Sequence, residues 1–189
     1  MDDGSFVFQG QGTLYNQTGQ SVYQGLWEVG TRSGNGTAWL EDGSIYSGNW
    51  VDDYPDGKGT YLFPDGTEYE GGFIRGKKHG QGTFKEADGF VSYDGEWKDG
   101  QRFGKGRVNK RDSSSYDGDW LDGKPHGNGM FTYPDGRVYT GTMKQGLRQG
   151  LGELRRSDGS IAYEGEWDRN LRHGKGKAYS ASGLIKFDG

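Results

Sequence analysis

The three histidines are the first residues to test for chemistry, because imidazole is a common metal ligand and general base. They are His79, His126 and His173, and each stands immediately before a Gly-x-Gly triplet. If the intervening segments are neighbouring strands about 4.8 Å apart, roughly 20 Å separates each histidine from the next. Zinc–nitrogen bonds are about 2 Å long, so one ion cannot gather them. We expect turn residues here, with an intermolecular metal site as the alternative.

The other polar residues form no arrangement that is typical of an enzyme. The acidic side chains recur along one exposed face, whereas catalytic pairs need an enclosed pocket that shifts their pKa values. The Gly-x-Gly pairs lack the third glycine and the acidic partner of a dinucleotide site, and no Walker sequence is present. Turns such as Asp56-Gly57 do not carry the ligand series of a calcium loop. The sequence therefore predicts no enzymatic activity and no cofactor.

Cationic residues gather near the histidine positions and define a second candidate site. One interpretation is a solvated edge, balanced by Asp99, Asp122 and Asp168. The other is contact with an acidic surface, such as an anionic phospholipid layer or an acidic protein tail. The residues concerned are Arg75, Lys77, Lys78, Arg102, Lys124, Arg148, Arg169, Arg172 and Lys175.

A period of 23 or 24 residues runs through the chain and organises all of these positions. Fixed-period self-similarity indicates a repeat architecture. A Tyr-x-Gly triplet begins each unit, a large side chain follows the tyrosine four residues later, and a Gly-x-Gly triplet keeps the same period. The tyrosines are Tyr23, Tyr46, Tyr69, Tyr93, Tyr116, Tyr139 and Tyr163. The large side chains are Trp27, Trp50, Phe73, Trp97, Trp120, Met143 and Trp167.

The unit Tyr-x-Gly-x-Trp-x-x-Gly-x-x-x-Gly-x-Gly resembles the MORN repeat. The segments YDGEWKDGQRFGKGR from Tyr93 and YEGEWDRNLRHGKGK from Tyr163 match it closely. The resemblance covers residues 8–189 as one array: a half repeat at 8–22, seven repeats and a partial repeat at 187–189. It implies a non-enzymatic scaffold, and many proteins of this kind belong to cytoskeletal or ciliary assemblies or tether membranes. The pattern of the family also favours histidine before Gly-x-Gly.

The composition predicts a thin core built from rings. Only 30% of the residues are hydrophobic, but the chain holds 38 glycines, 12 tyrosines and 6 tryptophans. There is no cysteine, which excludes a disulfide framework. The first residues lack the features of a signal peptide, and no stretch approaches the roughly 20 apolar residues of a membrane span. We therefore expect a cytoplasmic protein, and the resemblance to the MORN repeat implies that it is associated with the cytoskeleton or a cilium.

Each unit reads as two short strands. Alternation places the tyrosine, the glycine and the large ring of Tyr-x-Gly-x-Trp on one face. The second strand opens with Gly-x-Gly, whose missing side chains leave room for rings to lie flat over the backbone. Asp-Gly turns join the strands, with a looser turn at residues 112–115 and longer loops at the opposite edge, such as 76–80. The prediction is an all-β, elongated, single-layer antiparallel meander of about 15 strands, twisted into a curled ribbon.

The ring-bearing face is the preferred binding site. A large exposed aromatic patch usually marks a partner, and a helix or extended protein segment fits a groove along a sheet. The alternative is that the rings only cover glycines and leave no groove. The candidate residues are Tyr23, Trp27, Tyr46, Trp50, Tyr69, Phe73, Tyr93, Trp97, Tyr116, Trp120, Tyr139, Tyr163 and Trp167.

Charge and edges add further expectations about partners. Residues 1–92 carry a net charge of −7 and residues 93–189 a net charge of +3, which favours antiparallel self-association. Open sheet edges favour end-to-end association. Nucleic acid is not expected, because aromatic and cationic residues do not interleave as in a nucleic-acid platform. Membrane binding is less favoured than protein binding, because the chain is acidic overall.

Overall fold

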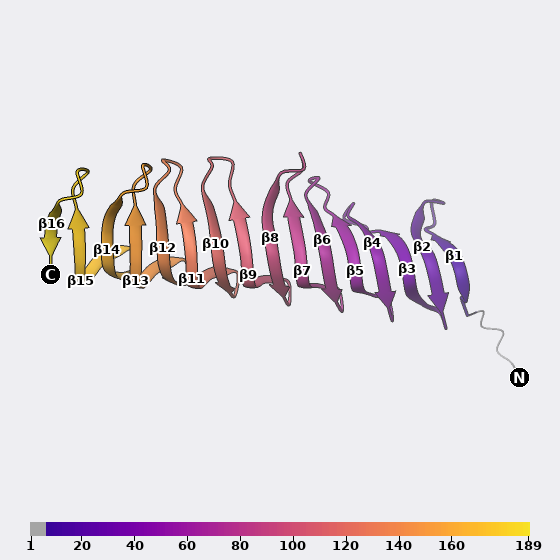
Figure 1. Ribbon diagram of the computed structural model, residues 1–189. Helices are drawn as coiled ribbons and strands as arrows, with labels where there is room; N and C mark the ends of the chain where they lie inside the picture. Colours follow the sequence, from indigo (N-terminus) through magenta and orange to yellow (C-terminus); the bar gives the residue numbers. More distant parts are fainter. Residues whose placement is uncertain (1–6) are drawn as a thin grey trace, which may run out of the picture. The chain divides into compact units, whose positions relative to one another are not determined.

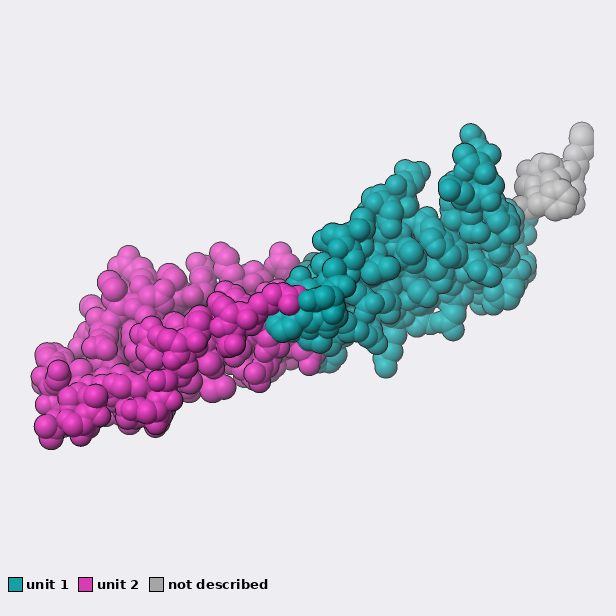
Figure 2. All heavy atoms as spheres, turned by 90° about the horizontal axis from the view of Figure 1, so that it is seen from above, with its two compact units in different colours: residues 1–91, 97–100 teal, residues 92–96, 101–189 magenta. Residues whose placement is uncertain are grey.

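The computed structural model describes residues 7–189, which form β-strands joined by turns. Sixteen strands make one antiparallel sheet in which every strand pairs with its neighbours in the chain, so the predicted all-β meander is confirmed (Figure 1). No helix of a length and hydropathy suited to crossing a membrane occurs in this part of the chain. The chain divides into two compact units, residues 1–91 with 97–100 and residues 92–96 with 101–189 (Figure 2).

The first unit holds seven complete strands. They are β1 (Gly10–Tyr15), β2 (Ser21–Glu28), β3 (Thr31–Trp39), β4 (Ile45–Val51), β5 (Tyr54–Leu62), β6 (Glu68–Ile74) and β7 (Lys77–Lys85). Strand β8 (Val91–Lys98) contributes residues to both units. The second unit holds β9 (Gln101–Asn109), β10 (Ser115–Leu121), β11 (Lys124–Thr132), β12 (Val138–Lys144), β13 (Leu147–Arg155), β14 (Ile161–Asp168), β15 (Leu171–Tyr179) and β16 (Ile185–Asp188).

The two kinds of turn differ from the expectation in their length. The Asp-Gly turns are the longer ones; between β5 and β6, for example, Phe63 donates to the carbonyl of Thr67 and Gly66 has a φ of 84°. The opposite edge carries two-residue turns rather than long loops. Arg75 and Gly76 form one of these, with φ values of 46° and 78°, as a type I′ hairpin requires. The expectation of longer loops at that edge was wrong.

The turn at residues 112–115 is not looser than the others. Ser113 takes the glycine position with a φ of 68°, and its N–H donates to the carbonyl of Lys110 at 3.1 Å. The Asp112 carboxylate accepts hydrogen bonds from the backbone and hydroxyl of Ser114 at 2.9 and 2.6 Å. These bonds lower the pKa of Asp112, with the hydroxyl bond as the largest cause. The local aspartate network holds the turn without glycine.

The two glycines of each Gly-x-Gly triplet have different roles. Gly80 has a φ of 70°, and the β6–β7 register shifts between Gly71 and Phe73. The first glycine therefore supplies the left-handed backbone of a bulge. Gly82 has no such conformation, but an added Cβ would overlap the Tyr69 ring. Only the second glycine has the predicted role of making room for a ring.

Candidate functional site: the ring-bearing face

The seven repeat tyrosines lie flat over paired glycines. Tyr69 is 0% exposed, its ring covers Gly71 and Gly82, and its hydroxyl donates to the carbonyl of Gly72 at 3.0 Å. Burial raises the pKa of Tyr69 to about 12. The other six tyrosines make the same bond to the residue three positions later, at 2.8–3.1 Å. The sheet thus folds around phenol rings that fill the space left by glycine.

The large rings lock neighbouring repeats together. Trp50 packs edge-to-face on Tyr46 and Tyr23, with centroids 5.1 and 5.4 Å apart, and its indole N–H donates to the carbonyl of Gly36 at 3.0 Å. Such pairs contribute about 0.5–1.5 kcal/mol beyond the area that they bury. The same indole bond recurs at Trp97, Trp120 and Trp167.

All thirteen rings singled out from the sequence are core residues, because none is more than 7% exposed. The structure brings them onto one face of the sheet, but they do not form an open patch. A partner lying on this face would contact the side chains beside and above them. This burial agrees with the alternative interpretation of the sequence, in which the rings only cover glycines and leave no groove.

A second set of aromatic side chains stays accessible on the same face, and we call these the flanking rings. Tyr61 lies opposite both Tyr46 and Tyr69, and Phe131 lies opposite both Tyr116 and Tyr139. Directly opposed residues share a face. The members are Tyr61, Phe63, Phe84, Phe131 and Tyr133, all half-buried. The candidate list lacked them, although their alternation behind Gly-x-Gly was a usable signal.

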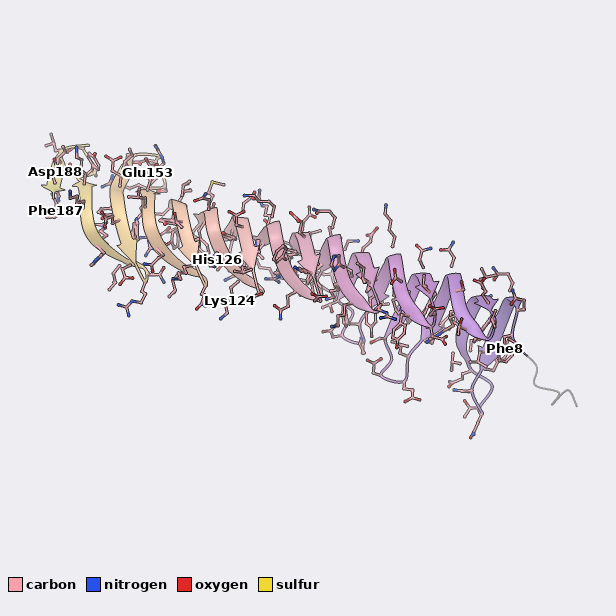
Figure 3. All side chains as sticks on the ribbon, turned by 90° about the horizontal axis from the view of Figure 1, so that it is seen from below. Phe8, Lys124, His126, Glu153, Phe187 and Asp188 are labelled. Carbon is pink, nitrogen blue, oxygen red and sulfur yellow. The ribbon has the colours of Figure 1, made fainter. Side chains whose placement is uncertain are left out.

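Eight of the nine candidate cationic residues divide into two sets, and the ninth, Lys175, is exposed on β15. Lys78, Arg102, Arg148 and Arg172 each stand nine residues after a repeat tyrosine, and each lies over rings of the core. The shortest distances from their charged groups to centroids of core rings are 4.8, 4.8, 4.0 and 4.8 Å. Four of the nine predicted cationic residues therefore belong to the ring-bearing face. The other set is exposed at or beside the two-residue turns and comprises Arg75, Lys77, Lys124 and Arg169 (Lys124 is labelled in Figure 3).

Lys78 occupies a cage of aromatic side chains in the first unit. Its Nζ lies 5.1, 5.1, 4.7 and 4.8 Å from the ring centroids of Phe63, Tyr69, Phe84 and Trp97. Cation–π attraction at such distances contributes about 0.5–2 kcal/mol in total at a partly exposed site. The lysine thus connects the buried rings to the flanking rings.

The opposite face carries cross-strand ion pairs. Lys85 lies 2.8 Å from Glu68 and 3.0 Å from Glu70, and hydrogen bonds to these carboxylates raise the pKa of Lys85. Lys105 pairs with Asp119 at 2.5 Å. The acidic residues of this face are therefore partly balanced by bases on neighbouring strands.

The histidines occupy equivalent places on β7, β11 and β15, and Figure 3 labels His126 near the start of its strand. Across residues 7–189 no group of three or more histidine, aspartate or glutamate side chains is placed to hold a metal ion. The charge of His126 contributes to lowering the pKa of Asp119, although the hydrogen bond from Lys105 is the larger cause. The three histidines therefore lie in strands, and the expectation that they are turn residues was wrong.

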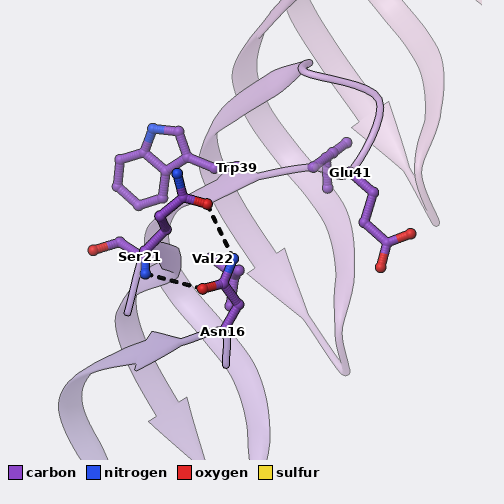
Figure 4. A pocket seen from close by; sticks show the side chains of 7 residues that line it. Asn16, Ser21, Val22, Trp39 and Glu41 are labelled. Carbon is purple, nitrogen blue, oxygen red and sulfur yellow. Dashed lines mark hydrogen bonds between the residues drawn. The ribbon is translucent and has the colours of Figure 1, made fainter. Parts of the chain in front are cut away.

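The described surface includes open depressions in both units. One, of about 470 Å³, lies at the first unit beside Trp39 and Leu40, where the Asn16 side-chain amide donates to Gln20 at 3.2 Å (Figure 4). Another, of about 330 Å³, lies between Glu164 and Asp188 in the second unit. Both are open to solvent, so neither has the enclosure that shifts a catalytic pKa.

The family model of the MORN repeat matches seven segments that begin at the seven repeat tyrosines. They are residues 23–45, 46–68, 69–90, 93–109, 116–136, 139–161 and 163–185. The chain belongs to the MORN repeat family. The predicted resemblance is therefore confirmed, and MORN repeats form non-enzymatic scaffolds. Among curated proteins the sequence has no match.

One solved structure with a similar fold is the TCP domain of SAS-4 (dCPAP) from Drosophila melanogaster, in complex with a proline-rich motif of Ana2 (dSTIL). The similarity covers 95% of this MORN chain and 90% of that chain, with a TM-score of 0.50 and 12% sequence identity. At that identity the likeness concerns the fold alone.

Proposed function

We propose that this MORN-repeat chain is a cytoplasmic scaffold that binds proteins through its ring-bearing face, within a cytoskeletal or ciliary assembly. The observation that carries the proposal is the row of flanking rings beside a core that is already filled. Tyr61 and Phe131 remain half-buried even though the neighbouring tyrosines are fully covered. Half-exposed aromatic side chains on a rigid sheet offer contact area at a low cost in conformational entropy.

An extended or helical protein segment is the partner that suits this surface. Aromatic side chains in rows suit a chain laid along a sheet, and proline-rich segments commonly dock on aromatic-lined surfaces. The Drosophila domain of similar fold was solved with a proline-rich motif, which supports an extended segment as one form of partner. The cytoskeletal or ciliary setting rests on what the family implies.

The test compares two double variants that differ only in the face they alter. Tyr61→Ala with Phe131→Ala removes two flanking rings, whereas Leu62→Ala with Met130→Ala truncates the adjacent, exposed residues of the opposite face. Both proteins should keep the circular dichroism spectrum of the wild type. We expect the first pair to lose partners recovered from the native cell and the second to retain them. Equal recovery by all three proteins would contradict the proposal.

Peripheral membrane binding is the second candidate, because exposed cations protrude at the two-residue turns. Arg75, Lys77 and Lys124 are exposed, whereas Arg169, the fourth residue of this set, pairs with Asp168 at 3.1 Å. Co-sedimentation with anionic liposomes tests this function. Screening is weakest at low salt, so absence of binding there would count against the membrane function.

Self-association is the remaining proposal about partners. The acidic first half and basic second half favour antiparallel pairing of two chains, and strands at the ends of a sheet favour end-to-end pairing. Sedimentation at two salt concentrations separates the two modes, because only the antiparallel pair depends strongly on charge. A monomer at both salt concentrations would exclude both modes.

A further inference from the structure

In five of the seven repeats the residue nine positions after the tyrosine is an arginine or lysine that lies over rings, and in two of these a residue of the next two-residue turn bonds its side chain. Arg32 and Arg148 occupy this position in the first and the second unit. Both arginines stack on a tryptophan, with the guanidinium carbon 4.2 Å from the Trp50 centroid and 4.0 Å from the Trp167 centroid. The two sites therefore share their aromatic support.

Asp53 neutralises Arg32. The Asp53 carboxylate accepts hydrogen bonds from the backbone N–H and the Nε of Arg32, both at 2.9 Å. The Asp53 carbonyl accepts a third bond, from a terminal nitrogen of Arg32 at 2.8 Å. These bonds lower the pKa of Asp53 against the opposing effect of its burial. In the first unit the guanidinium thus carries its own counter-ion.

Asn170 makes the same bonds to Arg148 without supplying a charge. Its amide oxygen accepts from the backbone N–H and the Nε of Arg148 at 2.9 and 3.3 Å, and its carbonyl accepts from a terminal nitrogen at 2.7 Å. Asn170 has a φ of 71° and Asp53 a φ of 67°, so the two turns match. Arg148 is held in the geometry of an ion pair, but no carboxylate of residues 7–189 lies within ion-pair distance of it.

A second guanidinium lies over Tyr163, the ring that packs edge-to-face on Trp167. Arg172 lies opposite Trp167 in the β14–β15 register, and its guanidinium carbon is 4.8 Å from the Tyr163 centroid. It too has no carboxylate within ion-pair distance among the described residues. Arg148 and Arg172 therefore flank Trp167 from the two neighbouring strands. The Nε and one terminal N–H of Arg148 are used, which leaves three of about five guanidinium donors for a ligand.

We propose that Arg148 and Arg172, supported by Trp167 and Tyr163, bind carboxylate groups of an acidic protein segment that lies on the ring-bearing face of the second unit. The inference rests on the proposed function, because it takes this face as the protein-binding one. Arginine suits the role, since its planar fork matches carboxylate geometry and stacks on rings. Both guanidinium groups lie over rings, where an extended chain reaches them, whereas a flat lipid layer first meets the exposed turn cations.

The experiment measures binding of a labelled oligoglutamate peptide to the full chain at low salt. Asn170→Asp should neutralise Arg148 and keep the fold, because Asp53 makes the equivalent bonds to Arg32. We expect this variant to weaken binding about tenfold, as loss of one charge-assisted contact implies, and Arg148→Met to weaken it similarly. The matched control is Gln145→Asp, which makes the same charge change in a turn position that Asp122 already fills with a φ of 50°. Gln145→Asp should reduce peptide binding less than about twofold, because a solvent-exposed charge outside the binding site has only a small effect.

Each outcome decides the inference. Unchanged binding by Asn170→Asp, or an equal loss in Gln145→Asp, overturns it, as does failure of the wild type to bind the peptide. Binding of phosphatidylserine vesicles with the same dependence on Asn170→Asp, but without peptide binding, would make a lipid surface the ligand instead. Loss of peptide binding in Asn170→Asp together with unchanged partner recovery by the Tyr61→Ala, Phe131→Ala protein would overturn the proposed function alone. Unchanged peptide binding by Asn170→Asp, together with loss of partners by the Tyr61→Ala, Phe131→Ala protein, would overturn this inference alone.

Discussion

The indole N–H of Trp97 donates a 3.0 Å hydrogen bond to the backbone carbonyl of Gly82, fifteen residues earlier in the chain. The glycine that makes room for the Tyr69 ring therefore also receives the polar end of the next ring. One residue thus connects the tyrosine of its own repeat with the tryptophan of the following repeat. This relationship explains why the tyrosine, the glycine and the tryptophan keep one common period.

Trp97→Phe should lower the free energy of unfolding by about 1–3 kcal/mol, because a buried hydrogen bond is lost and the ring becomes smaller. Chemical denaturation measures the effect. The control is Trp39→Phe, since Trp39 is 36% exposed and is bordered by an open depression. That change should stay within about 0.5 kcal/mol. Equal effects of the two variants would indicate that the indole bond contributes nothing specific.

Gly82→Ala should destabilise the protein by about 1–3 kcal/mol or more, because the new methyl group overlaps the Tyr69 phenol and the core has no space to relax. Gly12→Ala is the matched control. Gly12 holds the same place in its Gly-x-Gly triplet, but an added Cβ there meets only the Trp27 ring, at 3.3 Å. A thermal melt should show a large fall in Tm for the first variant and a small change for the second. A comparable fall for both would mean that glycine is needed for its backbone and not for space.

Much of this fold follows from the period alone. Alternation within Tyr-x-Gly-x-Trp predicts that these residues share one face. The structure also confirms that the Tyr69 ring lies over Gly82, in the space that a side chain would otherwise fill. The burial of the rings could not be predicted from the sequence. It arises because residues about eighteen positions away in sequence, such as Arg32 over Trp50, lie on top of the rings. Sequence spacing places a residue on a strand, but it does not say what a long flexible side chain covers.

The division of the cationic residues was hidden for the same reason. Arg148 and Arg169 looked alike in sequence, yet one stacks on Trp167 and the other sits in a turn beside Asp168. The two residues differ in their position relative to the two-residue turn. That position decides whether a side chain lies in the turn or points toward the ring-bearing face of a strand. The sequence prediction placed that turn too far along the chain, so it could not separate the two sets.

Stability should fall steeply above about pH 10, because burial raises the pKa values of the repeat tyrosines. The pKa of Tyr69 and that of Tyr139 rise to about 12, and burial raises those of Tyr46 and Tyr116 as well. Unfolded tyrosine loses its proton near pH 10. Between these values the unfolded chain binds fewer protons than the folded chain, so the free energy of unfolding decreases as pH rises.

Parallel pH titrations of circular dichroism and phenolate absorbance test this expectation. The stabilising contribution is fully present below about pH 10 and is lost as pH approaches the folded pKa values. Phenolate absorbance of the buried tyrosines should therefore appear together with loss of the β-sheet signal. Ionisation of all tyrosines near pH 10 with the sheet intact would contradict the burial of the phenols.

Ser113→Gly should stabilise the protein by up to about 1 kcal/mol. Ser113 has a φ of 68°, a conformation that costs an ordinary residue about 1–2 kcal/mol, and glycine removes that strain at some cost in unfolded-chain entropy. The reciprocal change is Gly89→Ser in the equivalent turn. Gly89 has a φ of 83° and open space around an added Cβ, so only backbone strain should appear. We expect opposite shifts of Tm for the two variants. A stabilising Gly89→Ser, or a destabilising Ser113→Gly, would show that the turn's aspartate network and not its backbone conformation sets the energy.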